Sequence, residues 1–493
     1  MTRRMSEIGL LLATLSLTAC VQGRDYERPS VEVPNTWSQM TKADPAQFPP
    51  DQQPDAEWWR AFGNDELTGL IERALKKNHD VKRAVTRVME SRAAVMSASA
   101  GLYPQVNLQS SYSSLAVSKN TFAGLGLARG GQPGPQVFAA PGSTFNLWNG
   151  SIDLRWELDF WGRIRRGEEA AVAEVGANEQ DARAVALSLI SDLGQSYFRI
   201  RELDEQMEIA TRTVAVRQES LDIIKKRASV GLASDLDVAR TDVLLAEAAG
   251  LIPDLTRSRA IELHRLEVLT GSSPGTMDLP RKSLGATVTQ PEIPVGLPSQ
   301  LLERRPDILQ SESTLIAANA RIGQARAYFF PTLSITGQGG LQSAEFANWF
   351  SGNSWNYSIG PSITLPIFLG GTNVARLDQA ESRFQQMLES YRQTILQAFR
   401  EVADLLVSLD SRTEQLARQR EQLTAARTAV TLATVRYRKG LVNYLDVLDA
   451  QRGALTAETQ VVLTERARLT DMVSLFKALG GGWKQPASPT SPS

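Results

Sequence analysis

Alternation of apolar and polar residues marks four stretches of the chain as β-strands. The clearest runs from Trp148 to Asp159, and a second lies between Trp355 and Ile367. Two more begin near Val106 and Leu333. Because successive side chains of a strand point to opposite faces, each stretch predicts a strand with one apolar and one polar face.

Such strands are typical either of a soluble β-sandwich with one solvent-exposed face or of a transmembrane β-barrel whose apolar face contacts lipid. Their length, about 12 to 14 residues, is enough to cross a bilayer at a tilt, which favours the barrel. Aromatic residues near the expected strand ends, as in an interfacial girdle, favour it too; these are Tyr112, Trp148, Trp355 and Tyr357.

Four strands cannot close a barrel alone, because the smallest barrels have roughly eight. Unpaired strand edges are not tolerated in lipid, so we expect the chain to oligomerise. Two copies supply about eight strands, which side chains would fill, whereas three supply about twelve and leave room for a passage.

Two much longer stretches predict helices. No proline interrupts the helical pattern from Arg163 to Ser229 or from Thr372 to Lys439, and each stretch of roughly 67 residues would span about 100 Å. Apolar residues recur every seven positions, at Ala186, Leu193, Ile200, Met207, Val214, Leu221 and Ala228, and at Ile395, Val402, Leu409, Leu416, Leu423, Val430 and Tyr437. This repeat predicts left-handed supercoiling against neighbouring helices. A free-standing coiled coil would explain the helices but not the strands.

Each long helix is followed by a tight turn and another helix. Gly231 and Gly440 are expected to adopt the left-handed conformation that ends a helix. Ser234 and Asn443 are expected to cap the helices that follow. The two turns together predict a tip built from both halves of the chain.

The chain contains two copies of one unit. Asp80 recurs as Asp307, 227 positions later, and Leu236 recurs as Leu445, 209 positions later. The offset shrinks because the first copy carries a longer Gly/Pro-rich loop, residues 124–142. We therefore expect a signal peptide at 1–19, an extended lipid-anchored arm at 20–62, a first repeat at 63–279, a Pro-rich linker at 280–300, a second repeat at 301–479 and a tail at 480–493. Each repeat has the order helix, two strands and two long helices.

Composition narrows the function. Apolar residues make up 42% and charged residues 22%, which is typical of a folded protein, and the net charge of −1 gives no general attraction for nucleic acid. One cysteine and two isolated histidines, His79 and His264, argue against a disulfide, a Cys/His metal site and His-based catalysis. No phosphate-binding loop, zinc-protease helix, nucleophile elbow or paired Cys motif occurs. We expect no enzyme activity, no metal and no cofactor.

The single cysteine ends an export signal. A basic start and a short apolar stretch lead to Leu17-Thr18-Ala19-Cys20, which resembles the bacterial lipoprotein cleavage box. The resemblance implies cleavage before Cys20 and an N-acyl diglyceride on it; the alternative is an ordinary signal peptide with a chance cysteine nearby. By analogy with such lipoproteins, Val21 rather than aspartate favours the outer membrane.

Taken together, the chain resembles the TolC-type outer-membrane efflux proteins, in the lipoprotein branch that partners resistance-nodulation-division (RND) pumps. The residues that carry the resemblance run nearly the whole chain; they include Cys20 to Pro29, Trp156 to Arg163, Leu302 to Ile308, Phe329 to Pro331, Pro366 to Gly371, Ala398 to Asp404 and Leu479 to Trp483. One departure is Arg24, where the family commonly has proline.

The resemblance implies a mixed α and β fold built from a duplicated α-β-β-α protomer. In a homotrimer, twelve strands form an outer-membrane β-barrel that continues into a periplasmic α-helical barrel, with a small mixed equatorial region. It implies a passive duct for drugs or other small toxic compounds, with a closed periplasmic tip that a membrane-fusion adaptor and an inner-membrane RND pump open. The alternative is a TolC-like exit duct for type I protein secretion; the lipoprotein signal favours efflux. A third class, an envelope enzyme or scaffold, lacks any supporting motif.

The family's constriction falls on residues 444–452 of this chain. Leu445 and Asp449 share one helix face, so three copies would form a leucine ring and a carboxylate ring around the axis. The alternative is that Leu445 packs and Asp449 is a surface acid. Candidate latch contacts, exchangeable on opening, join Tyr444, Asp446 and Arg452 to Asp235, Asp237 or Arg240. Gly231 and Gly440 would lie at adaptor-docking tips, or serve the turns alone.

Overall fold

The computed structural model describes residues 21–34, 37, 57–116, 118, 120, 142, 144–285, 291, 293 and 298–481. The expected signal peptide, Cys20, most of the arm beyond residue 34, nearly all of the loop at 124–142, part of the linker and the tail beyond residue 481 lie outside these residues. The predictions made for those segments therefore remain predictions.

The chain divides into two compact units. Of the described residues, the first unit, here the sheet unit, contains those within 21–28, 91–175 and 315–387, and the second, the helix unit, contains those within 29–90, 176–314 and 388–481. Each unit draws segments from both expected repeats. The repeats are thus a property of the sequence, and the compact units combine them.

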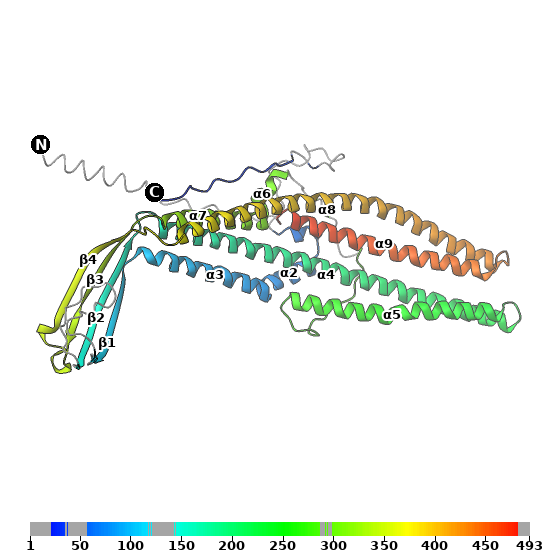
Figure 1. Cartoon of the computed structure of the whole chain (residues 1–493). Coiled ribbons are helices and arrows are strands. Elements are labelled where there is room, and N and C mark those ends of the chain that lie inside the picture. Colours follow the sequence, from blue (N-terminus) through cyan, green and yellow to red (C-terminus); the bar gives the residue numbers. More distant parts are fainter. Residues whose placement is uncertain are drawn as a thin grey trace. The chain divides into compact units, whose positions relative to one another are not determined.

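The sheet unit contains four antiparallel strands in the order β1-β2-β3-β4 (Figure 1). Their bounds are β1 (Gln105–Ala116), β2 (Thr144–Leu158), β3 (Thr332–Ser343) and β4 (Trp355–Thr364). All four stretches predicted from alternation are confirmed. The strand β4 ends before Ile367, where the alternation ends, because Pro366 lacks a backbone N–H and restricts the residue before it.

The register puts most apolar residues of the four strands on one face, although Leu115, Phe145 and Leu147 lie on the other. Tyr112 pairs with Trp148, Leu108 with Ile152, and Gly339 with Tyr357. The other face carries Asn107, Gln109, Asp153, Arg155, Gln338, Asn356 and Ser358. Within the described chain, β1 and β4 each have a partner on one side only.

Small residues pack the helices of the sheet unit. Here α4 (Arg163–Ser229) and α7 (Pro306–Ala327) contribute a buried alanine cluster, with Ala170 on α4 and Ala317 and Ala320 on α7. Without large side chains between them, the two backbones approach closely. This contact joins a segment of the first repeat to a segment of the second.

The helix unit is built mainly of long helices, and short turns join α4 to α5 and α8 to α9 (Figure 1). Besides segments of α4 and α7 it contains η3 (Trp58–Phe62), α2 (Asp65–Lys77), α5 (Asp235–Leu269), η5 (Pro298–Gln300), α6 (Leu301–Arg304) and α9 (Tyr444–Ala478), with parts of α3 (His79–Ser99) and α8 (Thr372–Arg438). The helices α4 and α8 have 67 residues each, and α5 and α9 have 35 each. Their equal lengths support the duplication.

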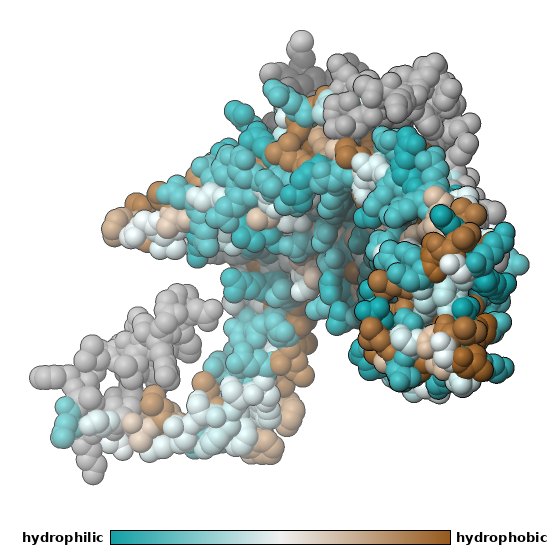
Figure 2. Space-filling view, turned by 90° about the vertical axis from the view of Figure 1, so that its right-hand side faces the viewer, coloured by the Kyte–Doolittle hydropathy of each residue, from teal (hydrophilic) through white to brown (hydrophobic). Residues whose placement is uncertain are grey.

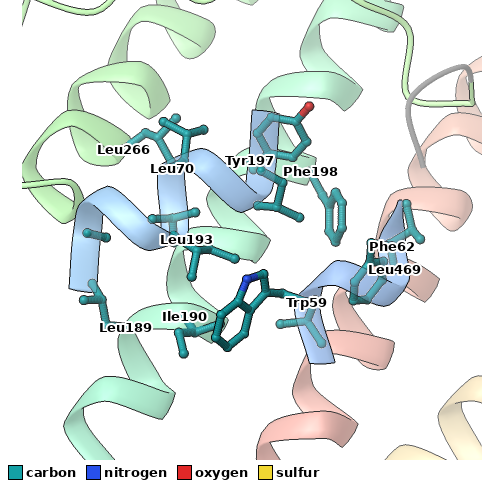
Figure 3. Packing of buried hydrophobic residues seen from close by; sticks show 14 of the residues in the cluster. Trp59, Phe62, Leu70, Leu189, Ile190, Leu193, Tyr197, Phe198, Leu266 and Leu469 are labelled. Atoms are coloured by element: carbon teal, nitrogen blue, oxygen red, sulfur yellow. The ribbon is translucent and has the colours of Figure 1, made fainter. Parts of the chain in front are cut away.

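The seven-residue repeat faces the interior, as predicted. Leu193, Ile200, Val402 and Leu416 are all buried. The main core forms where η3 and α2 insert between the long helices (Figure 3). There, aromatic side chains from η3, α4 and α9 meet; they are Trp58, Trp59, Phe62, Tyr197, Phe198 and Phe476.

Candidate functional site

The candidate site lies at the two helical turns of the helix unit. Gly231 and Gly440 have φ of 76° and 74°, the left-handed region predicted for them. Each turn closes with the same pair of bonds: the glycine N–H donates to Ala228 or Tyr437, and the next N–H to Arg227 or Arg436. A Cβ at either glycine would meet no atom within 4 Å, so only the backbone conformation requires glycine here.

The two turns differ in how the following helix begins. Ser234 Oγ accepts from the Asp237 N–H at 3.2 Å, and the Asp237 carboxylate accepts from Ser234 Oγ at 2.8 Å and from its N–H at 3.2 Å, which completes a capping box. Asn443 takes the corresponding position, but its side chain makes no capping hydrogen bond. The predicted cap is therefore confirmed for Ser234 and wrong for Asn443.

The first turns of α9 have a buried and an exposed face. Tyr444 and Val447 are buried, whereas Leu445 is 49% exposed and Asp449 and Arg452 are exposed. Leu445, Asp449 and Arg452 stand at positions i, i+4 and i+7, so they form one stripe along the helix. We call this set the exposed stripe.

An apolar cluster beneath the turns joins all four helices. Ile224 of α4, Leu244 of α5 and Tyr444, Val447 and Leu448 of α9 are buried in it, and Tyr437 of α8 packs against them. The rings of Tyr437 and Tyr444 lie 5.0 Å apart, and the Arg227 guanidinium stands 4.8 Å from the Tyr437 ring. The two hairpins are thus packed together at their turns. The sequence placed Tyr437 in the seven-residue repeat but gave no sign of its stacking partners.

Among the residues that the structure describes, the latch candidates of the two repeats form no ion pair with one another. Asp237 serves the capping box, and Asp235 and Arg240 are exposed. Among the ion pairs between described residues, none joins these three to Tyr444, Asp446 or Arg452. Asp446 lies in the first turn of α9, where its charge suits the positive end of the helix dipole.

Sequence reasoning missed Arg217 of α4. Its side chain is 3% exposed, donates to the Leu244 carbonyl, and lies 3.9 Å from Glu247. Burial lowers the pKa of Arg217, Glu247 opposes this, and the charge of Arg452 adds to the lowering. Arg452 therefore lies near a cation of the first repeat. No pattern local to Arg217 could have revealed this, because its partners lie on other helices.

Two further properties concern the described residues only. No three His, Cys, Asp or Glu residues among them are placed to hold a metal ion. No helix within the same ranges combines the length and apolar character needed to cross a membrane.

Comparison with known proteins identifies the family. The family model described as outer membrane efflux protein matches residues 70–272 and 297–481. The cation efflux system protein CusC of Escherichia coli O6:H1 is 34% identical over 481 residues, covering 96% of this chain and 97% of CusC. The outer membrane protein OprJ of Pseudomonas aeruginosa is 32% identical over 479 residues, covering 97% of this chain and 96% of OprJ. The open-state crystal structure of the Neisseria gonorrhoeae outer membrane channel MtrE superposes with a TM-score of 0.80 at 30% identity, covering 94% of this chain and 98% of MtrE.

The chain belongs to the outer membrane efflux protein family. It is an outer-membrane efflux channel and not an enzyme, and the fold class predicted from its sequence is confirmed. The gate, latch and docking roles of individual residues are not addressed by these similarities and remain predictions.

Proposed function

We propose that three copies of this chain form a passive duct across the outer membrane, supplied by an inner-membrane RND pump through a periplasmic adaptor. The observation that carries the proposal is the open four-stranded sheet, with one apolar face and two edges that lack partners within the described chain. An apolar face suits lipid, but open edges do not, so neighbouring copies must pair them. Three sheets give about twelve strands and room for a passage.

Crosslinking tests this arrangement directly. Cysteines introduced in β1 and β4, on the polar face at Gln109 and Ser358, should form disulfides between neighbouring protomers and yield a covalent trimer on a denaturing gel. Because the sequence contains one natural cysteine, Cys20, few other products are possible. Dimers as the largest product, or bonds within one chain only, would contradict the trimer.

Efflux is tested in cells. Removing the protein should increase susceptibility to several antibiotics, solvents or metal ions, and supplying the chain again should restore resistance. The cargo class follows from the compounds affected, and CusC is named for cations whereas OprJ is not. An in-cell crosslinking pull-down separates an RND pump from the secretion ATPase that the alternative, type I protein secretion, requires.

The exposed stripe supports a gate at the helical turns. Leu445, Asp449 and Arg452 are exposed in one chain, whereas the opposite face of the same helix, with Tyr444, Val447 and Leu448, is buried in the bundle. Three such stripes facing a common axis would place a leucine ring beside a carboxylate ring. Since the latch candidates of the two repeats form no ion pair with one another within the described chain, their contacts would form between protomers.

The turns themselves suit adaptor docking. Val230, Leu232 and Leu441 flank Gly231 and Gly440, and all three side chains are largely exposed. Figure 2 faces the side on which the turns lie, and hydrophobic patches interrupt the hydrophilic surface there. Exposed apolar side chains at a turn favour contact with another protein.

The lipid anchor is the remaining part of the proposal. Acylation of Cys20 would attach the start of the arm to the outer membrane, and several acyl chains hold a protein firmly. Labelled palmitate should enter the wild-type chain and not a Cys20→Ser variant. Equal labelling of the two would contradict it.

A further inference from the structure

The residues that follow Cys20 pack against the rest of the sheet unit. Val21 packs against Gly162, which has φ of 77°; a Cβ there would come within 2.5 Å of the Val21 side chain. The Gln22 N–H donates to the Trp161 carbonyl at 3.0 Å. The first contacts of this segment are therefore with the turn between β2 and α4.

The arm then crosses α7 at a point where both segments have a glycine. A Cβ on Gly23 would lie 2.6 Å from the Gly323 Cα, and one on Gly323 would lie 2.6 Å from the Gln22 carbonyl oxygen. Both contacts are with backbone, which cannot turn aside as a side chain can. The crossing is therefore possible only with glycine at both positions.

One buried arginine holds the arm at this crossing. Arg166 of α4 has a side chain only 7% exposed, and it donates to the Gln22 carbonyl at 3.1 Å, to the Gly23 carbonyl at 3.0 Å and to the Asp25 carboxylate at 2.9 Å. Arg166 also donates to the Glu169 carboxylate at 2.7 Å. Without the arm, Arg166 would lose three acceptors, and an unpaired buried charge is costly.

A second helix supplies the last contact. Asn319 of α7 donates to the Arg24 carbonyl at 3.0 Å. The arm thus binds α4, from the first repeat, and α7, from the second. Beside it, the rings of Trp161 and Phe330 stack at 4.7 Å, and Trp161 Nε1 donates to the Pro331 carbonyl at 2.7 Å.

We propose that Gly162, Arg166, Asn319 and Gly323 form an acceptor site for residues 21–25, the segment directly after the acylated cysteine. Occupation of this site ties α4 to α7. It also fixes where the lipid anchor starts, because the Cys20 Cα lies about 3.8 Å from that of Val21. The Trp161–Phe330 pair at the same place suits a membrane interface. The statement about lipid rests on the proposed acylation, whereas the peptide site does not.

Trypsin offers a test, because the bond after Arg24 lies inside the segment and the Arg28–Pro29 bond resists the enzyme. In the purified, full-length oligomer, cleavage after Arg24 should be slow, as followed by mass spectrometry of the N-terminal fragment. Gly323→Ala should displace the arm and raise the rate at least tenfold. Gly352→Ala is the matched control, because its Cβ would meet nothing within 4 Å, and it should leave the rate unchanged.

A second variant changes only the arm, so the fold of the body is not at risk. Gly23→Val should raise the rate as much as Gly323→Ala does. The proposal would be overturned if Gly23→Val were cleaved after Arg24 at the wild-type rate. It would also be overturned if the Gly352→Ala control were cleaved as fast as Gly323→Ala. Cys20→Ser should keep Arg24 protected, so a failure of acylation and a failure of the acceptor site give different results.

Discussion

Glu267 of α5 is a buried carboxylate stabilised by three backbone N–H groups, with a smaller electrostatic contribution from His264. It accepts from the N–H groups of Gly275, Thr276 and Met277 at 2.7, 2.7 and 2.6 Å. Burial by itself would raise the pKa of Glu267, but these three donors outweigh it, and the pKa is held below its ordinary value. The ionised carboxylate is therefore part of the fold around the end of α5.

This carboxylate makes the helix unit sensitive to acid. Because the folded-state pKa is below the ordinary 4.5, its contribution is present above pH 4.5 and is lost as pH falls through the folded-state value. Glu267→Gln should destabilise the protein by about 2 kcal/mol at pH 7. Thermal unfolding between pH 7 and about pH 3 should show the difference between wild type and variant unchanged above pH 4.5 and shrinking below it. A constant difference would contradict the assignment.

At the exposed stripe, charge is expected to limit ion flow. Neutral substitutions at Asp449 and Arg452 should raise single-channel conductance in planar bilayers severalfold, since they remove both the carboxylate ring and any charged contact that holds the tip closed. Asp242→Asn, at an exposed acid of α5, is the control and should leave conductance unchanged. Wild-type conductance in the double variant would count against both the ring and the latch.

At the scale of elements, identical substitutions should have opposite effects at two glycines of one hairpin. Gly440 has φ of 74°, whereas Gly453 lies within α9; a Cβ at either would meet nothing within 4 Å. Gly440→Ala should destabilise the protein by about 1 kcal/mol because of backbone strain. Gly453→Ala should stabilise it by about 0.5–1 kcal/mol. Thermal unfolding measures both, and effects of equal sign would refute the backbone argument.

The two helix starts should also respond differently. Ser234→Ala removes a capping box and should cost about 1 kcal/mol. Asn443→Ala should cost little, since the Asn443 side chain makes no capping bond. Hydrogen exchange of the first turns of α5 and α9 distinguishes the two. An equal loss of protection in both helices would mean that Asn443 caps α9 in solution.

The elements were predictable because their signals are local. Periodicity located β1 to β4 and gave α4 its bounds at Arg163 and Ser229. The positive φ of Gly231 followed from its place after a helix. By contrast, the partners of Arg217 and Arg166 come from segments distant in sequence, so only the folded chain reveals them. Asn443 shows the limit of a local rule: it has the right residue type and position but makes no bond.

At the scale of the whole molecule, the gate was predictable only as a face of a helix. The sequence placed Leu445 and Asp449 together, and the structure adds that Arg452 continues their stripe. The sequence could not show that the charge of Arg452 acts on Arg217, because the two residues belong to different repeats. Which groups meet across the axis depends on the neighbouring protomers.

The open edges of β1 and β4 have a genetic consequence. If each barrel draws one sheet from each of three copies, a defective copy damages every complex that it enters. With equal amounts of wild-type and defective chains mixing at random, only about one eighth of trimers are wholly wild type. Prolines at both Ser358 and Ile359, adjacent positions whose N–H groups point to opposite sides of β4, would block its outer edge and leave β1 able to accept a neighbour.

Co-expressing this variant with the wild type at equal levels should therefore lower resistance far more than co-expressing an empty vector does. Resistance equal to that with the empty vector would show that the variant never enters a trimer. A dominant effect of defective copies is therefore expected from a sheet whose two edge strands, within the described chain, are each paired on one side only.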